Sequence, residues 1–195
     1  MARAMKLLAE TRARLEELVD PAYRAQIVRL VPTSAPLLGV RVPALRALAK
    51  QIDREHVLTA ESAIALLHAA AKRRCREELL VGIFVVARSK QRIAYVTWRD
   101  LDTWVDAIEN WEVCDQLAMT IARERLDDDA IGRLARWAKS PNLWRRRFAV
   151  ATIATAKIGR RDVERVLAPV SADKEPMVKK AVVWARRELA KRRPG

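Results

Sequence analysis

The stretch Leu143–Arg147, LWRRR, sets an apolar pair before basic residues, and the pattern returns 34 residues later as Met177–Ala181, MVKKA. Asp115 lies 32 residues before Arg147, at the matching place of the preceding unit. A period of this length built from two helices is typical of α-solenoids of the HEAT type, whose stacked inner helices line one concave surface. The sequence therefore predicts an all-α, HEAT-like helical-repeat solenoid with a concave basic groove. The alternative is an irregular helical bundle, in which these positions would not align.

The composition favours helix along the rest of the chain. Five glycines and eight prolines occur in 195 residues, and we find no convincing strand. We predict a single domain over residues 1–195, with its longest irregular connection at Val31–Val42. The expected helices are 2–19, a short one up to about Leu30, Pro43 to Ile52, one that opens at Thr59–Ser62, Arg74–Ala87, Arg99–Ile108, one around Trp111, Asp127–Lys139, Pro141–Ala156, Arg160–Leu167 and Glu175–Arg192.

The net charge of +14 and the pI near 10.7 indicate a polyanion-binding protein. No apolar run approaches the ~20 residues that span a bilayer, and the first residues lack a signal-peptide core. We therefore expect a cytoplasmic protein that does not bind membranes. Cys75 and Cys114 have no CxxC or CxxH partner, so we expect neither a disulfide nor a metal site. His56 and His68 are isolated, and we expect no cofactor.

Trp111 and Asp115 stand four residues apart on a predicted helix and so share one face. An advance of about 100° per residue sets them away from an apolar stripe and beside two small residues, Ala118 and Ala122. The stripe consists of Val113, Leu117 and Ile121. An aromatic ring and one acid would then look over a smooth groove. The alternative is a boundary tryptophan beside a solvated acid.

Two further residues depart from the pattern of their helices. Trp184 shares the polar side of its helix with Lys180 and Arg187, which favours a binding surface. Arg147 stands on an otherwise apolar stripe, where an unpaired charge would be costly. It is either half of a partly buried salt bridge or a phosphate clamp. The solenoid would place three more predicted DNA-binding residues on its inner helices: Arg146, Lys179 and Lys180.

Four ordered motifs carry a family resemblance. They are GVRVPALR at Gly39–Arg46, WExxD at Trp111–Asp115, NLWxxR at Asn142–Arg147 and KAxxWxxR at Lys180–Arg187. Together they resemble the AlkD family of bacterial DNA alkylation repair enzymes, from about residue 20 to the end. The resemblance implies an all-helical, HEAT-like DNA glycosylase that removes N3- or N7-alkylated purines from duplex DNA without flipping the base into a pocket.

Carried over by position, the resemblance makes Trp111, Asp115 and Trp184 the catalytic, lesion-site residues. It makes Arg147 and Arg187 contacts to the DNA backbone. Tyr23 aligns with the family's N-terminal aromatic only through a gap, so it receives no role. The implied partner is double-stranded DNA containing alkylated bases, and the implied location is the bacterial cytosol, in association with the nucleoid. We expect a monomer.

One carboxylate suits this reaction. An alkylated N3 or N7 makes the purine cationic, so it leaves without protonation and no general acid is needed. What remains is to stabilise an oxocarbenium-like sugar and guide a water, which Asp115 alone could do. The two tryptophan faces would each contribute roughly 0.5–2 kcal/mol to holding the cationic lesion.

Two other functions fit the same composition. A HEAT-like protein could grip damaged or branched DNA without chemistry. An RNA-binding or scaffolding solenoid would need the basic surface but not Asp115. The combination of Trp111, Asp115 and Trp184 favours the enzyme over both.

Overall fold

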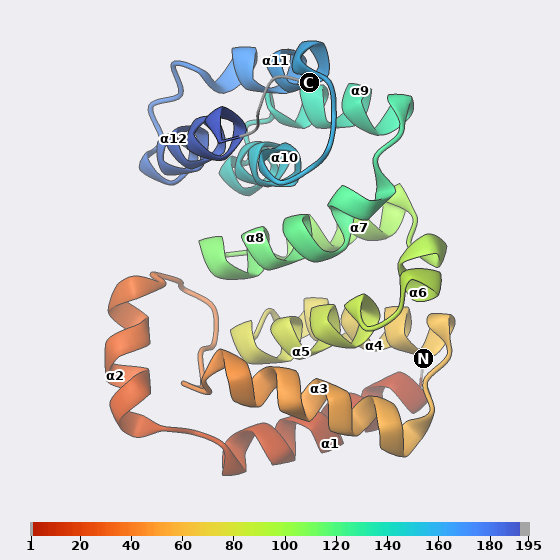
Figure 1. The fold of residues 1–195 in the computed structure, drawn as a ribbon. Helices are drawn as coiled ribbons and strands as arrows, with labels where there is room; N and C mark the ends of the chain where they lie inside the picture. The colour runs from red at the N-terminus through yellow and green to blue at the C-terminus, as the bar shows by residue number, and fades with distance from the viewer. Residues whose placement is uncertain (1, 192–195) are drawn as a thin grey trace. The chain divides into compact units, whose positions relative to one another are not determined.

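The computed structural model describes residues 2–191, which fold into helices joined by turns (Figure 1). The α-helices are α1 (Ala2–Glu17), α2 (Pro21–Leu30), α3 (Val42–His56), α4 (Ala60–Arg73), α5 (Arg76–Ala87), α6 (Lys90–Tyr95), α7 (Trp98–Asp106), α8 (Trp111–Thr120), α9 (Asp128–Trp137), α10 (Leu143–Ala154), α11 (Arg160–Leu167) and α12 (Pro176–Ala190). Two short 3-10 helices are η1 (Ala122–Arg125) and η2 (Ala168–Val170). No strand occurs in residues 2–191, which confirms the all-α prediction.

The helix bounds follow local capping chemistry. Asp20, Thr59 and Asn142 each accept a hydrogen bond from a backbone N–H of the first turn that follows. Thr97 and Asp100 form a reciprocal capping box at the start of α7. Because Asn142 is a cap, α10 begins two residues later than the predicted Pro141. The predicted end of the last helix, Arg192, lies outside the described residues.

The chain forms two compact units, Met1–Val113 and Cys114–Gly195, and their boundary falls inside α8. The single domain and the concave groove remain predictions. The second unit carries 20 Lys and Arg against 10 Asp and Glu, so it holds +10 of the net +14.

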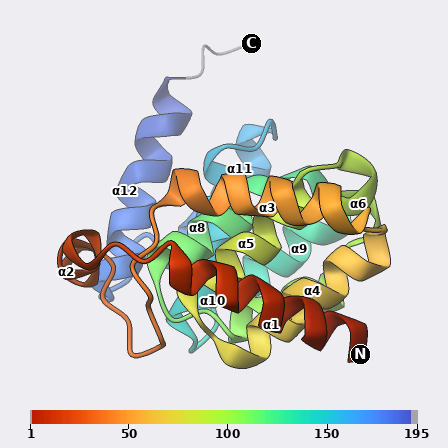
Figure 2. The same ribbon diagram turned by 90° about the horizontal axis from the view of Figure 1, so that it is seen from below.

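The first unit is built around α5, in which every residue from Arg76 to Val86 is buried. Helices α3 and α4 pack on it most extensively, and α1 and α6 also contact it. The close approach of α4 needs Gly82, since a Cβ there would lie 2.9 Å from a methyl of Leu67. Figures 1 and 2 show α1 and α3 side by side, with α2 running across their ends.

The segment after α2 packs around a small apolar cluster of Ile27, Val31 and Leu37. Gly39 allows the chain to turn there, because its φ of +93° is a conformation that side chains disfavour. A Cβ at Gly39 would also lie 2.4 Å from the Cβ of Arg24. The segment is therefore fixed by packing and by one obligatory glycine.

The second unit contains two successive helix pairs, α9 with α10 and α11 with α12. Helices α10 and α12 pack against each other, and α9 packs against α11. Residues Arg147–Ala154 of α10 are all buried. Because α10 and α12 contain the two halves of the 34-residue repeat, the arrangement is consistent with a helical-repeat solenoid.

Both cysteines are free and buried. Burial raises the pKa of the Cys75 thiol to about 11 and raises the pKa of Cys114 well above its ordinary value. Within residues 2–191, no helix combines the length and the apolar character needed to cross a membrane.

Candidate functional site

Helix α8 carries the predicted lesion-site pair on its first two turns. Val113, Leu117 and Ile121 are buried, as predicted. Ala118 and Ala122, which we expected beside an open groove, are instead fully buried. They share a stripe with Cys114, whose Sγ lies 3.7 Å from the carbonyl oxygen of Trp144, so a second face of α8 is covered as well.

Asp115 and Arg147 form a two-pronged ion pair. Nε of Arg147 donates to Oδ1 at 2.9 Å, and Nη2 donates to Oδ2 at 2.6 Å. The side chains are only 15% and 8% exposed. Nη1 of Arg147 donates to the carbonyl oxygen of Met177 at 2.5 Å. One guanidinium therefore joins α8, α10 and the first turn of α12.

This pairing explains the arginine on an apolar stripe. The structure contains the first of the two alternatives for Arg147, the partly buried salt bridge, and the phosphate contact stays a prediction. Burial raises the pKa of the Asp115 carboxyl, while the hydrogen bonds and charge of Arg147 lower it. The outcome is one largely desolvated carboxylate with a fixed orientation.

Trp111 lies half-buried at the start of α8 and packs against the apolar cluster of Ile27, Val31 and Leu37. Its Nε1–H donates to the carbonyl oxygen of Leu30 at 2.9 Å. Tyr23 packs against the same cluster. The structure thus brings together two aromatic residues whose relation the sequence left open.

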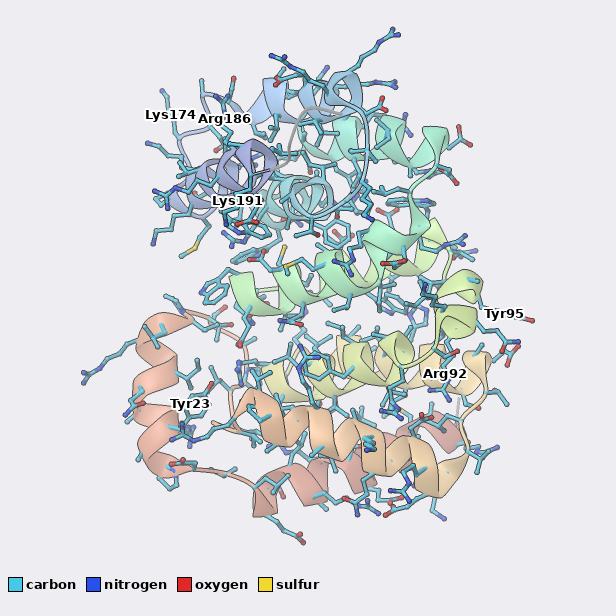
Figure 3. The ribbon with its side chains drawn as sticks, in the orientation of Figure 1. Tyr23, Arg92, Tyr95, Lys174, Arg186 and Lys191 are labelled. Atoms are coloured by element: carbon cyan, nitrogen blue, oxygen red, sulfur yellow. The ribbon has the colours of Figure 1, made fainter. Side chains whose placement is uncertain are left out.

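A buried arginine that the sequence analysis missed supports this region. Arg76 is fully buried, and it contacts Glu112 of α8 at 2.6 Å and Glu77 at 2.8 Å. It also donates to the carbonyl oxygen of Val40 and lies 3.5 Å from the hydroxyl of Tyr23. Figure 3 shows Tyr23 on the side of α2 that faces α3 and α5. The available signal was a charged start, REE, on the most apolar helix of the chain.

The basic residues of α12 are more exposed to solvent than Arg146 and Arg147 of α10. Lys179, Lys180 and Arg187 are exposed on α12. Trp184 is half-buried there and follows Met177 by two turns on the same face, ~10 Å along the helix.

Arg146 of α10, by contrast, is engaged within the protein. It binds Asp173 at 2.7 Å and the carbonyl oxygens of Ser140 and Pro141. Its donors are thus directed at the protein, and its contact with DNA stays a prediction, as does that of Arg147.

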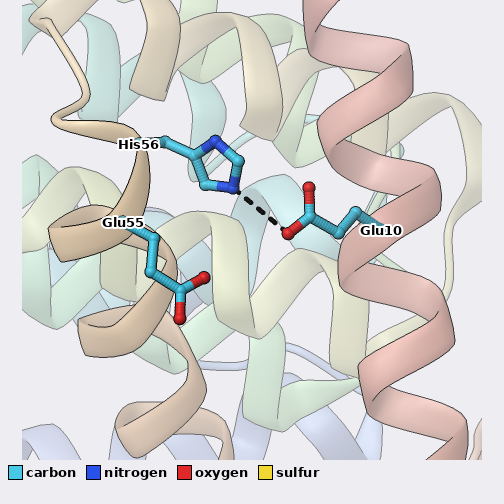
Figure 4. Close-up of side chains that lie close together, drawn as sticks. All are labelled: Glu10, Glu55 and His56. Carbon is cyan, nitrogen blue, oxygen red and sulfur yellow. Dashed lines mark hydrogen bonds and ion pairs between the residues drawn. The ribbon is translucent and has the colours of Figure 1, made fainter.

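One cluster in the first unit has the composition of a metal site. Ligand atoms of Glu10, Glu55 and His56 lie within 4.8 Å of one another (Figure 4). However, Arg14 already binds Glu10 at 2.6 Å and Glu55 at 2.7 Å. Because a guanidinium supplies the positive charge, we interpret the cluster as an ion-pair link between α1 and α3.

The chain matches a known protein family. Residues 11–195 match a family model described as DNA alkylation repair enzyme. The match covers nearly the whole chain. It includes all four sequence motifs and leaves out the first ten residues. The comparison with curated proteins gives no match.

Proposed function

The chain belongs to the family of DNA alkylation repair enzymes, and from this premise we propose that it is a DNA glycosylase. Its substrates would be cationic N3- and N7-alkylated purines in duplex DNA, and its reaction would be hydrolysis of the N-glycosidic bond. The observation that carries the proposal is the desolvated carboxylate of Asp115, held at both oxygens by Arg147. Trp111 precedes it by one turn on α8.

The chemistry asks little of the protein. A cationic purine is already a good leaving group, so no proton donor is required. As the bond lengthens, positive charge develops on the sugar, and a nearby carboxylate stabilises it more than it stabilises the ground state. Low exposure strengthens this effect, because water screens the charge less.

Arg147 does not prevent this role. A carboxylate has about four lone-pair positions, and a bidentate arginine uses two of them. The others remain to orient a water toward the anomeric carbon. We propose that Arg147 is the positioning residue that keeps Asp115 ionised and fixed in a site where burial favours its neutral form.

The remaining predicted residues would bind the substrate. We propose that the faces of Trp111 and Trp184 contact the deoxyribose and the lesion, without extrusion of the base into a pocket. Lys179, Lys180 and Arg187, exposed on α12, would contact backbone phosphates. The protein would act on double-stranded DNA as a monomer.

The test is release of 7-methylguanine from alkylated duplex DNA by the purified protein. Asp115→Asn keeps the shape but removes the charge, so single-turnover excision should fall by roughly 10- to 1000-fold. Affinity for undamaged duplex should survive. The matched control is Asp129→Asn, an exposed acid outside this site, which should excise like the wild type.

Two results would contradict the proposal. If Asp115→Asn excised as fast as the wild type, the carboxylate would have only a structural part in the salt bridge. If the wild type released no alkylated base yet bound duplex DNA, the protein would be a non-catalytic DNA-binding member of the family.

A further inference from the structure

A hollow of about 320 Å³ lies between α9, α11 and η2 in the second unit. Three of its lining residues lie on α9, at the spacing i, i+3 and i+4: Gly132, Ala135 and Arg136. Lys139 also lines it, from the turn that follows the helix. Across from them stand Arg165, Ala168 and Pro169. The lining thus combines short side chains with three long cations, Arg136, Lys139 and Arg165, which we term the rim.

The cations converge rather than spread. A Cβ placed on Gly132 would lie 3.7 Å from a guanidinium nitrogen of Arg165 and 3.8 Å from one of Arg136. Two guanidinium groups therefore lie around one point, and Lys139 lines the same hollow from the turn after α9. Like charges repel at such separations, so the arrangement favours an anion between them.

The rim has no internal counter-charge. Within residues 2–191, Arg136, Lys139 and Arg165 form no ion pair or side-chain hydrogen bond. Many other arginines of the protein do, including the neighbouring Arg146 and Arg147. Two forked donors and an ammonium are well matched to the oxygens of a phosphate group.

The hollow is lined by other elements than those that carry Arg147, Lys180 and Trp184. The α9 residues that line it lie on a different face from the buried Ile131, Leu134 and Ala138. It belongs to the α9–α11 pair, whereas Arg147, Lys180 and Trp184 belong to α10 and α12 (Figure 1).

We propose that Arg136, Lys139 and Arg165 form a second phosphate-binding site, which takes the backbone of a DNA segment separate from the one that carries the lesion. The excess of ten positive charges in this unit favours a polyanion as the source of the phosphate. This second site rests on the proposed binding of DNA, but it does not depend on the proposed glycosylase reaction. Such a site would let one protein hold two duplex segments.

The test counts duplexes per protein. Undamaged duplexes of ~10 base pairs, one helical turn, are titrated at low salt and the complexes are sized by analytical ultracentrifugation. The wild type should bind two. Gly132→Asp adds a carboxylate within reach of both guanidinium groups, so it should weaken the second site at least ~10-fold. Gly132→Ala fits the same space without charge and should still bind two.

A second pair of variants guards against misfolding of Gly132→Asp. The triple variant Arg136→Gln/Lys139→Gln/Arg165→Gln should likewise lose the second site and bind only one duplex. Its control removes three exposed cations from the first unit, Arg3→Gln/Lys90→Gln/Arg99→Gln, and should bind two. Release of 7-methylguanine should be unchanged in all of them, which separates this inference from the proposed function.

Three outcomes would overturn the inference. The wild type could bind a single duplex, or Gly132→Asp could bind two as readily as Gly132→Ala. Calorimetry with inorganic phosphate provides the third. If the wild type bound free phosphate, lost it with Gly132→Asp and never bound a second duplex, the site would serve a small anion rather than DNA.

Discussion

At the scale of single residues, the ion pair of Asp115 and Arg147 has two roles. It contributes to the stability of the fold, and it orients the carboxylate that we propose to be catalytic. A buried pair adds little net stability when both charges are present, but removing one partner leaves the other charge buried and unpaired. Arg147 also holds the carbonyl of Met177. Substitutions of Asp115 or Arg147 should therefore change the stability of the fold as well as the excision of the lesion.

Arg147→Ala should lower the free energy of unfolding by ~3 kcal/mol, because it strands the Asp115 carboxylate. Urea denaturation would measure this. Adding Asp115→Asn to Arg147→Ala should recover part of the loss, and a double-mutant cycle gives the coupling. If the two single losses simply added, the ion pair would not be the stabilising contact.

The ionisation of Asp115 should also appear in the pH profile of excision. Only the carboxylate stabilises the sugar cation, so activity should fall as the pH falls through the pKa of Asp115. Because burial raises that pKa, the acid limb should lie above ~3.9, the ordinary value for aspartate. Single-turnover rates over the acid range, corrected for loss of base without enzyme, would test it. A limb at or below the ordinary value would contradict the assignment.

At the scale of elements, the turn before α3 is fixed by α5. The carboxylate of Glu77 accepts hydrogen bonds from the backbone N–H groups of Leu38, Gly39 and Val40, and Arg76 holds the carbonyl of Val40. These charges sit at the first turn of the most buried helix, where a carboxylate also suits the helix dipole. The connection after α2 is irregular but ordered by hydrogen bonds.

Gly39→Ala should be among the most damaging small substitutions in the chain. The positive φ and the contact with Arg24 both oppose a Cβ, so we expect a loss of ~2 kcal/mol or more in the free energy of unfolding. Thermal or urea unfolding against the wild type would measure it. Gly132→Ala is the control and should not destabilise, because a Cβ there would make only ordinary van der Waals contacts within a helix.

The helices could be predicted from the sequence where apolar periodicity and caps agree. Arg160–Leu167 was predicted with the bounds of α11. Helix α6 has only six residues, and η1 and η2 fewer, so they carry too little periodicity to be seen. The spacing of Asp115 and Arg147 at 32 residues pointed to matching places in the repeat. That they would bind each other depends on how helices pack, which spacing alone does not determine.

The buried polar contacts were harder to predict. Arg76 reaches Tyr23 and Glu112 across 53 and 36 residues of sequence. Each of these contacts depends on tertiary packing that no local pattern encodes. For the same reason Trp111 could be recognised from the sequence, but the Leu30 carbonyl that it binds could not.

At the scale of the whole molecule, charge is unevenly distributed between the two units. Binding to duplex DNA should weaken steeply with salt, since each neutralised phosphate releases counterions. Lys180→Ala and Arg187→Ala should each reduce the slope of log affinity against log salt by about one unit. Lys90→Ala, in the first unit, is the control and should leave it unchanged. Equal slopes for all variants would remove α12 from the DNA-contacting surface.

The burial of both cysteines has a consequence for survival under chemical stress. The electrophiles that methylate purines also attack thiolates, which are the strongest nucleophiles among protein side chains. With a pKa of about 11, only ~10⁻⁴ of the Cys75 thiol is ionised at neutral pH. Neither sulfur is open to solvent. In a DNA alkylation repair enzyme with this structure, the cysteine sulfurs are therefore protected from the same electrophiles that alkylate DNA.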